Sequence, residues 1–148
     1  MAPTLFALFE RIHGHLAVLA LALLLHPVLT LRRRPLLARW TVLTAEIGAA
    51  MLTAAFALGW WLYPTYRVQV KPSLLAGAHS VAMAFETKEH LAFCAVALAV
   101  GGAVALRTSG ASPAGRRAAW HLLVAAWLCG AVTGVLGVFV ASIAQPGW

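Results

Sequence analysis

The sequence predicts an all-α integral membrane protein, an antiparallel four-helix bundle built from a duplicated helical hairpin. Three observations predict this fold. Of the 148 residues, 62% are hydrophobic and only 10% are charged, whereas soluble domains carry about 25% charged residues. The apolar residues gather in four stretches, each close to the ~20 residues that cross a bilayer. One of these stretches recurs later in the chain, which indicates duplication.

The four apolar stretches cover residues 15–31, 40–62, 90–106 and 119–143. The first and third are short, and we expect them to extend outward through 5–14 and 82–89. No positively charged region precedes the first stretch and no small-residue cleavage site follows it, so we expect it to remain in the mature protein.

The connection between the two halves is expected to be irregular. Pro64 and Pro72 should each end a continuous helix, because proline cannot donate the helical hydrogen bond. Between them, residues 66–70 are expected to form a short extended piece. From Ser73 the sequence is moderately apolar and predicts an interfacial helix that leads into the third span.

The segment that begins at His15 recurs at an offset of 75 residues. Residues 15–32 read HLAVLALALLLHPVLTLR and residues 90–107 read HLAFCAVALAVGGAVALR, aligned without a gap. Both copies begin with histidine and end with arginine, which a shared abundance of Ala and Leu does not explain. Residues 1–148 therefore form a single membrane domain with a first hairpin at 5–62, a loop at 63–81 and a second hairpin at 82–143. A parallel duplication of this kind places His15 and His90 at one depth.

The formal net charge of +7 comes mainly from arginines between the apolar segments. They gather in the short loops 32–39 and 107–118, which the positive-inside rule assigns to the cytoplasm. We expect an inner-membrane protein with both termini and the 63–81 loop outside, and no nucleic-acid partner. Cys94 and Cys129 should lie at different depths and remain free thiols.

Ionisable residues within spans usually mark function. His15 and His26 are eleven residues apart, so they share one helix face, ~16 Å apart in height. His13 lies ~200° around the helix from His15, so the two cannot both point into the bundle. The repeat partner of His15 is His90, whereas that of His13 is Lys88. We therefore expect His15 to be the inward residue.

Paired histidines at matched depth predict haem ligation. Two axial imidazoles from two helices can hold one haem b in a membrane bundle. His15 and His90 form a candidate outer pair, and His26 and His121 a candidate inner pair, for one or two haems. The competing interpretation is that these amphipathic side chains lie at the interface with no ligand.

Acidic residues allow other roles. Glu10 and His13 have the i, i+3 spacing of a carboxylate-bridged metal helix, and Glu86, Glu89 and His79 could complete an outer-face metal site. Glu46 near the cytoplasmic end could neutralise charge beside a cofactor, carry a proton to a quinone, or pair with an arginine of the loop.

The duplicated hairpin with histidines at these positions resembles the small membrane b-type cytochromes and, distantly, the four-helix halves of haem A synthase. The latter carry a Glu-x-x-His motif, which corresponds here to residues 10–13. This chain departs from the pattern, since Gly14 follows His13 where that family has arginine, and Gly101 stands at the repeat position of His26. The resemblance implies haem b and electron transfer between a quinol and a partner on the outer side.

Two further hypotheses remain open. The chain could be a non-catalytic accessory or assembly subunit of a larger membrane complex, or an outer-face metal-binding or transport protein. It contains no nucleotide-binding loop, no CxxCH haem attachment site and no nucleophile triad, so soluble-enzyme chemistry is not expected. If it acts in electron transfer, we expect a quinol-linked subunit rather than a stand-alone enzyme.

Overall fold

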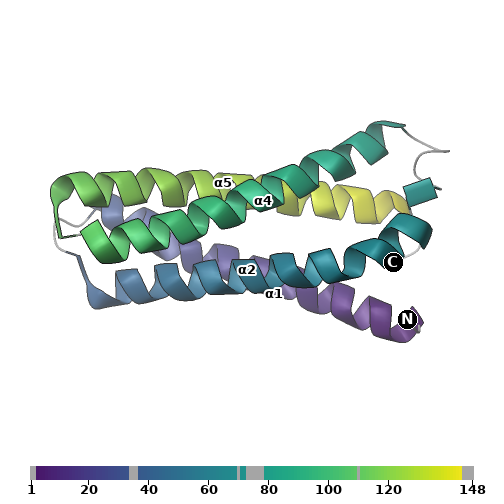
Figure 1. Cartoon of the computed structure of the whole chain (residues 1–148), viewed down its shortest axis with the longest axis horizontal. Coiled ribbons are helices and arrows are strands. Elements are labelled where there is room, and N and C mark those ends of the chain that lie inside the picture. Colours follow the sequence, from purple (N-terminus) through teal and green to yellow (C-terminus); the bar gives the residue numbers. More distant parts are fainter. Residues whose placement is uncertain (1–2, 34–36, 70, 73–78, 110, 145–148) are drawn as a thin grey trace.

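The protein is an all-α bundle of four long antiparallel helices (Figure 1). The computed structural model describes residues 3–33, 37–69, 71–72, 79–109 and 111–144. The helices are α1 (Pro3–Arg33), α2 (Arg39–Gln69), α4 (His79–Ser109) and α5 (Pro113–Ala144). Both termini lie at one end of the bundle, which we call the terminal end. The two short connections lie at the other, which we call the arginine end.

Each helix is long and apolar enough to cross a membrane. The candidate spans are Leu5–Arg32, Arg39–Val68, Ser80–Ser109 and Pro113–Ile143, with mean hydropathies between 1.7 and 2.2. Large apolar side chains also cover the outside of the bundle, among them Val18, Trp40, Val100, Val135 and Val138. An apolar exterior of this kind suits a lipid environment. The predicted membrane four-helix bundle is therefore confirmed, and both cysteines are free as expected.

The prediction that Pro64 ends the second helix is wrong. The α2 helix continues through Pro64 to Gln69, and α1 likewise continues through Pro27. Each proline removes only one backbone hydrogen bond, which helices in a membrane bundle tolerate. Most of the predicted 63–81 loop and its extended piece is consequently helical, and α4 already begins at His79. Residues 73–78, where we expected an interfacial helix to begin, lie outside the described residues.

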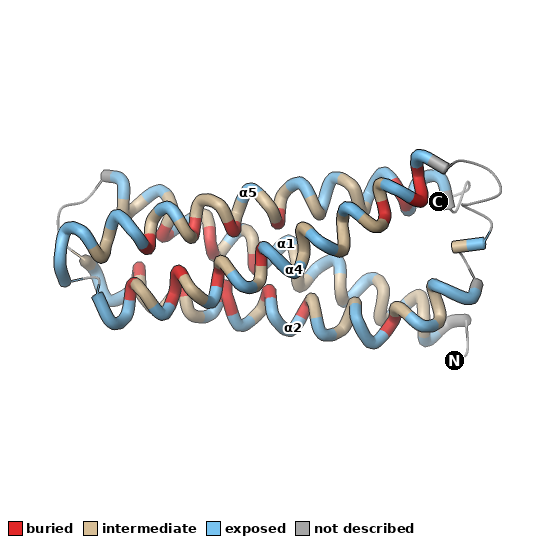
Figure 2. The backbone as a smooth tube through the Cα atoms, turned by 45° about the horizontal axis from the view of Figure 1, so that its top comes forward, coloured by how far each residue is buried: buried red, intermediate tan, exposed pale blue. Residues whose placement is uncertain are grey.

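The helices pack in a ring in the order α1, α2, α4, α5. The closest partners are the two helices of each hairpin, while α2 with α4 and α1 with α5 make the lighter contacts between hairpins. This places α1 diagonally opposite α4, and α2 opposite α5. Buried positions follow the inner faces of all four helices (Figure 2).

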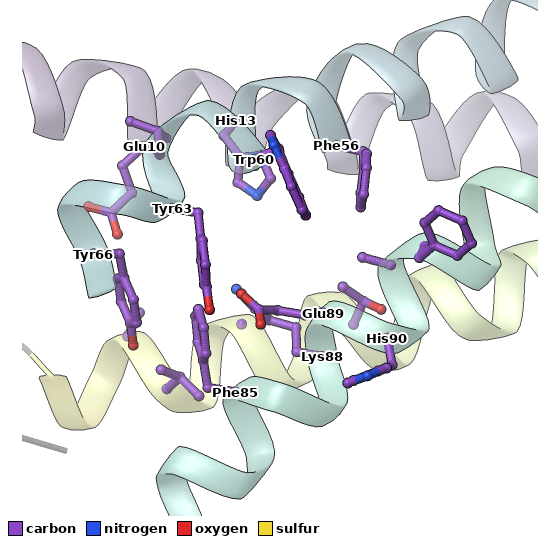
Figure 3. Close-up of a pocket in the computed structure, with 18 of the residues that line it drawn as sticks. Glu10, His13, Phe56, Trp60, Tyr63, Tyr66, Phe85, Lys88, Glu89 and His90 are labelled. Atoms are coloured by element: carbon purple, nitrogen blue, oxygen red, sulfur yellow. The ribbon is translucent and has the colours of Figure 1, made fainter. Parts of the chain in front are cut away.

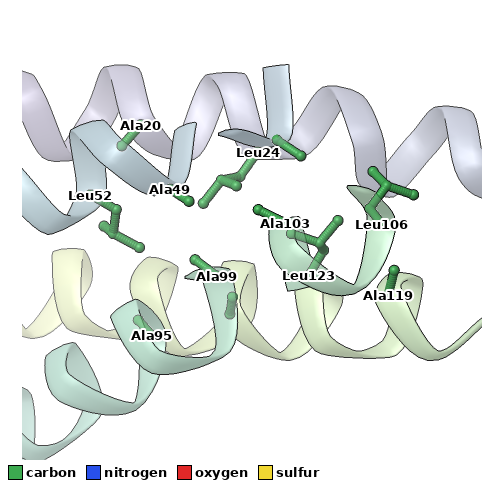
Figure 4. Packing of buried hydrophobic residues seen from close by; sticks show 12 residues of the cluster. Ala20, Leu24, Ala49, Leu52, Ala95, Ala99, Ala103, Leu106, Ala119 and Leu123 are labelled. Carbon is green, nitrogen blue, oxygen red and sulfur yellow. The ribbon is translucent and has the colours of Figure 1, made fainter. Parts of the chain in front are cut away.

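Small residues allow close packing in the half of the bundle near the arginine end (Figure 4). A methyl group added to Gly48 would lie 2.9 Å from Cγ of Leu24, and one added to Gly102 would lie 2.8 Å from Cγ of Leu123. In each hairpin, a leucine of one helix therefore packs directly against a glycine of the other helix. The surrounding core consists of alanine and leucine: Ala20, Leu24, Ala45, Ala49, Leu52, Ala95, Ala99, Ala103, Leu106, Ala119, Leu123 and Ala126.

Two tryptophan side chains of α5 donate hydrogen bonds to the backbone of α1. The indole Nε1 of Trp120 donates to the carbonyl oxygen of Val28 at 2.9 Å, and that of Trp127 donates to Leu21 at 3.1 Å. The donors are seven residues apart, and so are the acceptors. This matches two antiparallel helices in contact over two turns.

Candidate functional site

A cavity of about 530 Å³ lies in the half of the bundle near the terminal end (Figure 3). The helices spread apart toward this end (Figure 1), and all four contribute to the cavity wall. The lining residues are Phe6, Glu10, His13, Phe56, Gly59, Trp60, Leu62, Tyr63, Tyr66, Phe85, Lys88, Glu89, His90, Ala92, Phe93, Cys94, Thr133, Gly137, Val140 and Ala141. The wall is mainly apolar and aromatic, with a few ionisable groups, as is usual for small-molecule sites.

His13 is held in the cavity wall by α2. Its Nδ1 lies 2.8 Å from the carbonyl oxygen of Ala55, and its ring packs directly on Gly59. A carbonyl oxygen can only accept, so Nδ1 of the neutral imidazole carries the proton and Nε2 keeps its lone pair. This leaves Nε2 able to accept a hydrogen bond or a proton from a ligand.

Lys88 lies opposite on α4. Its Nζ is 4.7 Å from the centre of the Phe85 ring, a cation–π contact. The carboxylates of Glu10 and Glu89 line the same cavity (Figure 3). His13 and Lys88 occupy equivalent positions of the 75-residue repeat. The structure thus brings the side chains of these two equivalent positions into one cavity.

Aromatic rings form one side of the cavity. Tyr66 stacks on Phe85 with 4.3 Å between ring centres and 10° between planes, and Tyr63 stacks on Phe85 at 6.3 Å and 5°. Trp60 continues the series beside Tyr63. The Tyr66 hydroxyl oxygen is buried and has no hydrogen-bond partner among the described residues. A ligand in this cavity could supply that missing partner.

The prediction that His15 is the inward residue is wrong. His15 is exposed, and its Nδ1 lies 2.7 Å from the carbonyl oxygen of Arg11 in its own helix. The buried face of α1 passes through Ala20 and Leu24, which are seven and eleven residues after His13. Those spacings return to nearly the same side of a helix, so His13 faces the bundle and His15 faces outward.

His90 and His15 do not form a facing pair. His90 borders the cavity, but His15 is not among its lining residues. The His90 side chain is exposed and its Nδ1 lies 2.8 Å from the carbonyl oxygen of Glu86. Axial ligands must face each other across the iron, so this pair does not fit the predicted haem.

His26 and His121 also lie apart, on exposed positions near the arginine end. His26 Nδ1 is 2.8 Å from the Thr44 hydroxyl, which places this imidazole at the contact between α1 and α2. His121 lies on α5, with its Nδ1 2.8 Å from the carbonyl oxygen of Arg117. Their Nδ1 atoms bond to different helices, and neither side chain belongs to the alanine and leucine core. The residues present do not fit an inner haem held by this pair.

Glu46 pairs with Arg107. The guanidinium of Arg107, in the last turn of α4, donates to the Glu46 carboxylate on α2. Of the three roles that the sequence left open for Glu46, the ion pair with a loop arginine is the one present in the structure. It joins the two hairpins near the arginine end.

The carboxylates and histidines suggested as an outer-face metal site are not grouped together. No three His, Cys, Asp or Glu side chains among the described residues come close enough to hold a metal ion. Glu86 instead accepts a hydrogen bond from Lys71 at 3.0 Å, and this bond raises the pKa of the Lys71 ammonium. The cavity near the terminal end includes three of these residues: Glu10, His13 and Glu89. Glu86 does not line that cavity. The side chain of His79 lies outside the described residues.

Sequence reasoning missed several cavity residues. Four aromatic residues near the end of α2 carry no pattern that separates cavity residues from residues at the membrane boundary: Trp60, Trp61, Tyr63 and Tyr66. Both tyrosines line the cavity, and so does Trp60 although it is 71% exposed, whereas Trp61 is 55% exposed and is not a lining residue. Lys88 could have been found, because a lysine in an apolar span at the repeat position of a histidine is itself an unusual feature.

Comparison of the chain with protein-family models, with curated proteins and with solved structures gives no match. The site's own geometry is therefore the basis for assigning a function.

Proposed function

We propose that this protein is a quinol-linked electron-transfer subunit, and that the cavity near the terminal end binds the quinol ring. The observation that carries the proposal is His13, whose Nδ1–H is committed to the Ala55 carbonyl while the ring borders an aromatic cavity. A quinol is a flat aromatic ring with a hydroxyl at each of two opposite edges. Such a ligand needs aromatic walls and polar acceptors at its rim.

The cavity residues are suited to both parts of this ligand. Tyr63 and Trp60 line the cavity and provide aromatic walls for the ligand ring. His13 Nε2 provides an acceptor for one hydroxyl, and the carboxylate of Glu10 or Glu89 provides an acceptor for the other. Hydrogen bonds to such acceptors orient the ring as well as hold it.

The ionisable groups also suit proton release. Oxidation of a quinol to a quinone releases two protons and two electrons. In the proposal, His13 accepts one proton and a carboxylate of the cavity accepts the other. The two electrons pass one after the other to two one-electron carriers in a larger membrane complex. If the arginine end is cytoplasmic, as the positive-inside rule predicts, the protons leave on the outer side.

Calorimetric titration of the purified protein in detergent with a tail-less quinone tests the proposal. We expect saturable binding of 2,3-dimethoxy-5-methyl-1,4-benzoquinone or of menadione to the wild-type protein. His13→Ala should weaken it about three- to tenfold, which corresponds to the ~0.6–1.4 kcal/mol of one hydrogen bond within a membrane bundle. His15→Ala is the matched control, since this histidine lies two residues away on the exposed face. Lack of binding, or equal losses in both variants, would overturn the proposal.

A b-type cytochrome is the second candidate. The observation that favours it is that His13 and His90 border one cavity from two helices, each with Nδ1 bonded to a backbone carbonyl. That bond is the usual orienting contact of a histidine ligand. A reduced-minus-oxidised spectrum of the membrane-extracted protein decides the question. An α band that disappears in both His13→Ala and His90→Ala favours the cytochrome, and a featureless spectrum excludes it.

A further inference from the structure

We propose that the ligand of this cavity enters sideways from the bilayer, between α2 and α4, and carries a long apolar tail that stays in that opening. The inference rests on the proposed function, because it takes the ring in the cavity as given. It narrows the ligand to lipid-soluble quinols with a hydrocarbon or isoprenoid chain.

The first support is where the cavity wall is exposed. Trp60 on α2 is 71% exposed and Phe93 on α4 is 65% exposed, although both line the cavity. Cys94, next along α4, is also an exposed lining residue. On the α1 and α5 side, the lining residues are buried or half-buried apart from Ala141. The cavity therefore opens to the outside mainly between α2 and α4.

The second support is the chemistry of this opening. Phe56 on α2 and Phe93 on α4 meet edge to face with 6.2 Å between ring centres, and Phe56 also lies beside Trp60. These aromatic side chains offer packing surfaces for a hydrocarbon chain. The α2–α4 contact is also among the lighter ones in the bundle, so a chain can fit there without separating a tightly packed hairpin.

The third support is depth. Phe93 lies fourteen residues before Arg107, which corresponds to ~21 Å along the helix, within a hydrocarbon core of ~30 Å. Trp60 lies twenty-one residues after Arg39, or ~31 Å, near the boundary of that core. An opening between these two levels faces acyl chains rather than water. A ligand that uses it has to be soluble in the membrane.

Two quinones with the same ring test the inference, one without a tail (2,3-dimethoxy-5-methyl-1,4-benzoquinone) and one with a decyl tail (decylubiquinone). Phe93→Ala should weaken binding of the tailed quinone three- to tenfold more than binding of the tail-less one. The effect is modest because a tail in a micelle is already out of water, so only packing contacts are lost. Comparing variant with wild type for each ligand cancels partitioning into detergent.

Controls separate this inference from loss of fold and from failure of the proposed function. Val100→Ala, on the exposed side of the same helix and outside the cavity, should affect neither ligand. Decylubiquinone should also slow the alkylation of Cys94 by N-ethylmaleimide more than that of Cys129. If Phe93→Ala weakens both quinones equally or neither, lateral entry with a seated tail is wrong. If neither quinone binds wild-type protein, the proposed function fails, and the inference with it.

Discussion

The imidazole of His13 lies between Ala55 and Gly59 of the neighbouring helix, with Nδ1 2.8 Å from the Ala55 carbonyl oxygen and Cε1 directly above Gly59. Glycine allows this contact, since a β-carbon at position 59 would lie 2.8 Å from Cε1 and the ring would have to move. The α2 helix thus fixes both the hydrogen bond and the position of an imidazole that belongs to α1.

The first prediction concerns this contact. Gly59→Ala should displace the His13 ring and weaken quinone binding at least about fivefold, because the acceptor would move away from the ligand. Gly134→Ala is the control, since nothing lies within 4 Å of the β-carbon it would add. Calorimetric titration measures both variants. Unchanged affinity in Gly59→Ala would show that the position of His13 does not matter for binding.

The second prediction uses two adjacent glycines in α4. Gly102→Ala should destabilise the bundle by about 1–3 kcal/mol, the usual penalty for overpacking a core, because its β-carbon would lie 2.8 Å from Cγ of Leu123. Gly101→Ala meets no atom within 4 Å and should be neutral or stabilising, since alanine favours a helix. Unfolding in sodium dodecyl sulfate, followed by circular dichroism, compares the two variants. Equal stabilities would contradict the close packing of α4 on α5.

The third prediction concerns the contact between α1 and α5. Trp127→Phe keeps a ring but removes the donor to Leu21, and should lower the free energy of unfolding by about 0.6 kcal/mol, the average for a hydrogen bond between membrane helices. Combination with Trp120→Phe should double the loss, because the sites are ~10 Å apart and act independently. Trp40→Phe changes a side chain that is 70% exposed and should have no effect on detergent unfolding.

The fourth prediction concerns the ion pair of Glu46 and Arg107. A double-mutant cycle with Glu46→Gln and Arg107→Gln should give a coupling energy below about 1 kcal/mol, because the two side chains are 30% and 70% exposed. The coupling should decrease as salt is added. Quinone binding should be unchanged in both variants. Loss of binding in Glu46→Gln alone would instead show that the carboxylate contributes to quinone binding in addition to its ion pair.

The membrane bundle could be predicted from the sequence because length and apolarity alone decide whether a segment spans a bilayer. The ends of the helices could not be predicted from the sequence, as Pro64 shows. Proline is tolerated within helices of a membrane bundle, and α2 continues through Pro64 to Gln69. The free cysteines followed in the same way from depth along the helices.

The candidate site was only partly predictable. Helical periodicity correctly separated His13 from His15, but it could not say which of them faces inward. The match of His15 with His90 favoured the wrong one, since identical residues in a repeat can equally lie on matching exposed faces. The buried positions Ala20 and Leu24 settle the rotation of α1.

By itself, the sequence determined that this chain forms four apolar helices, and it listed the ionisable residues that those helices carry into the membrane. Only the tertiary structure decided how each helix is rotated about its axis and which neighbour it meets. That rotation is set by many small packing contacts, such as Leu24 against Gly48, which no local pattern encodes. It is the reason that His13 lines the cavity together with Lys88, while His15 points away from the bundle.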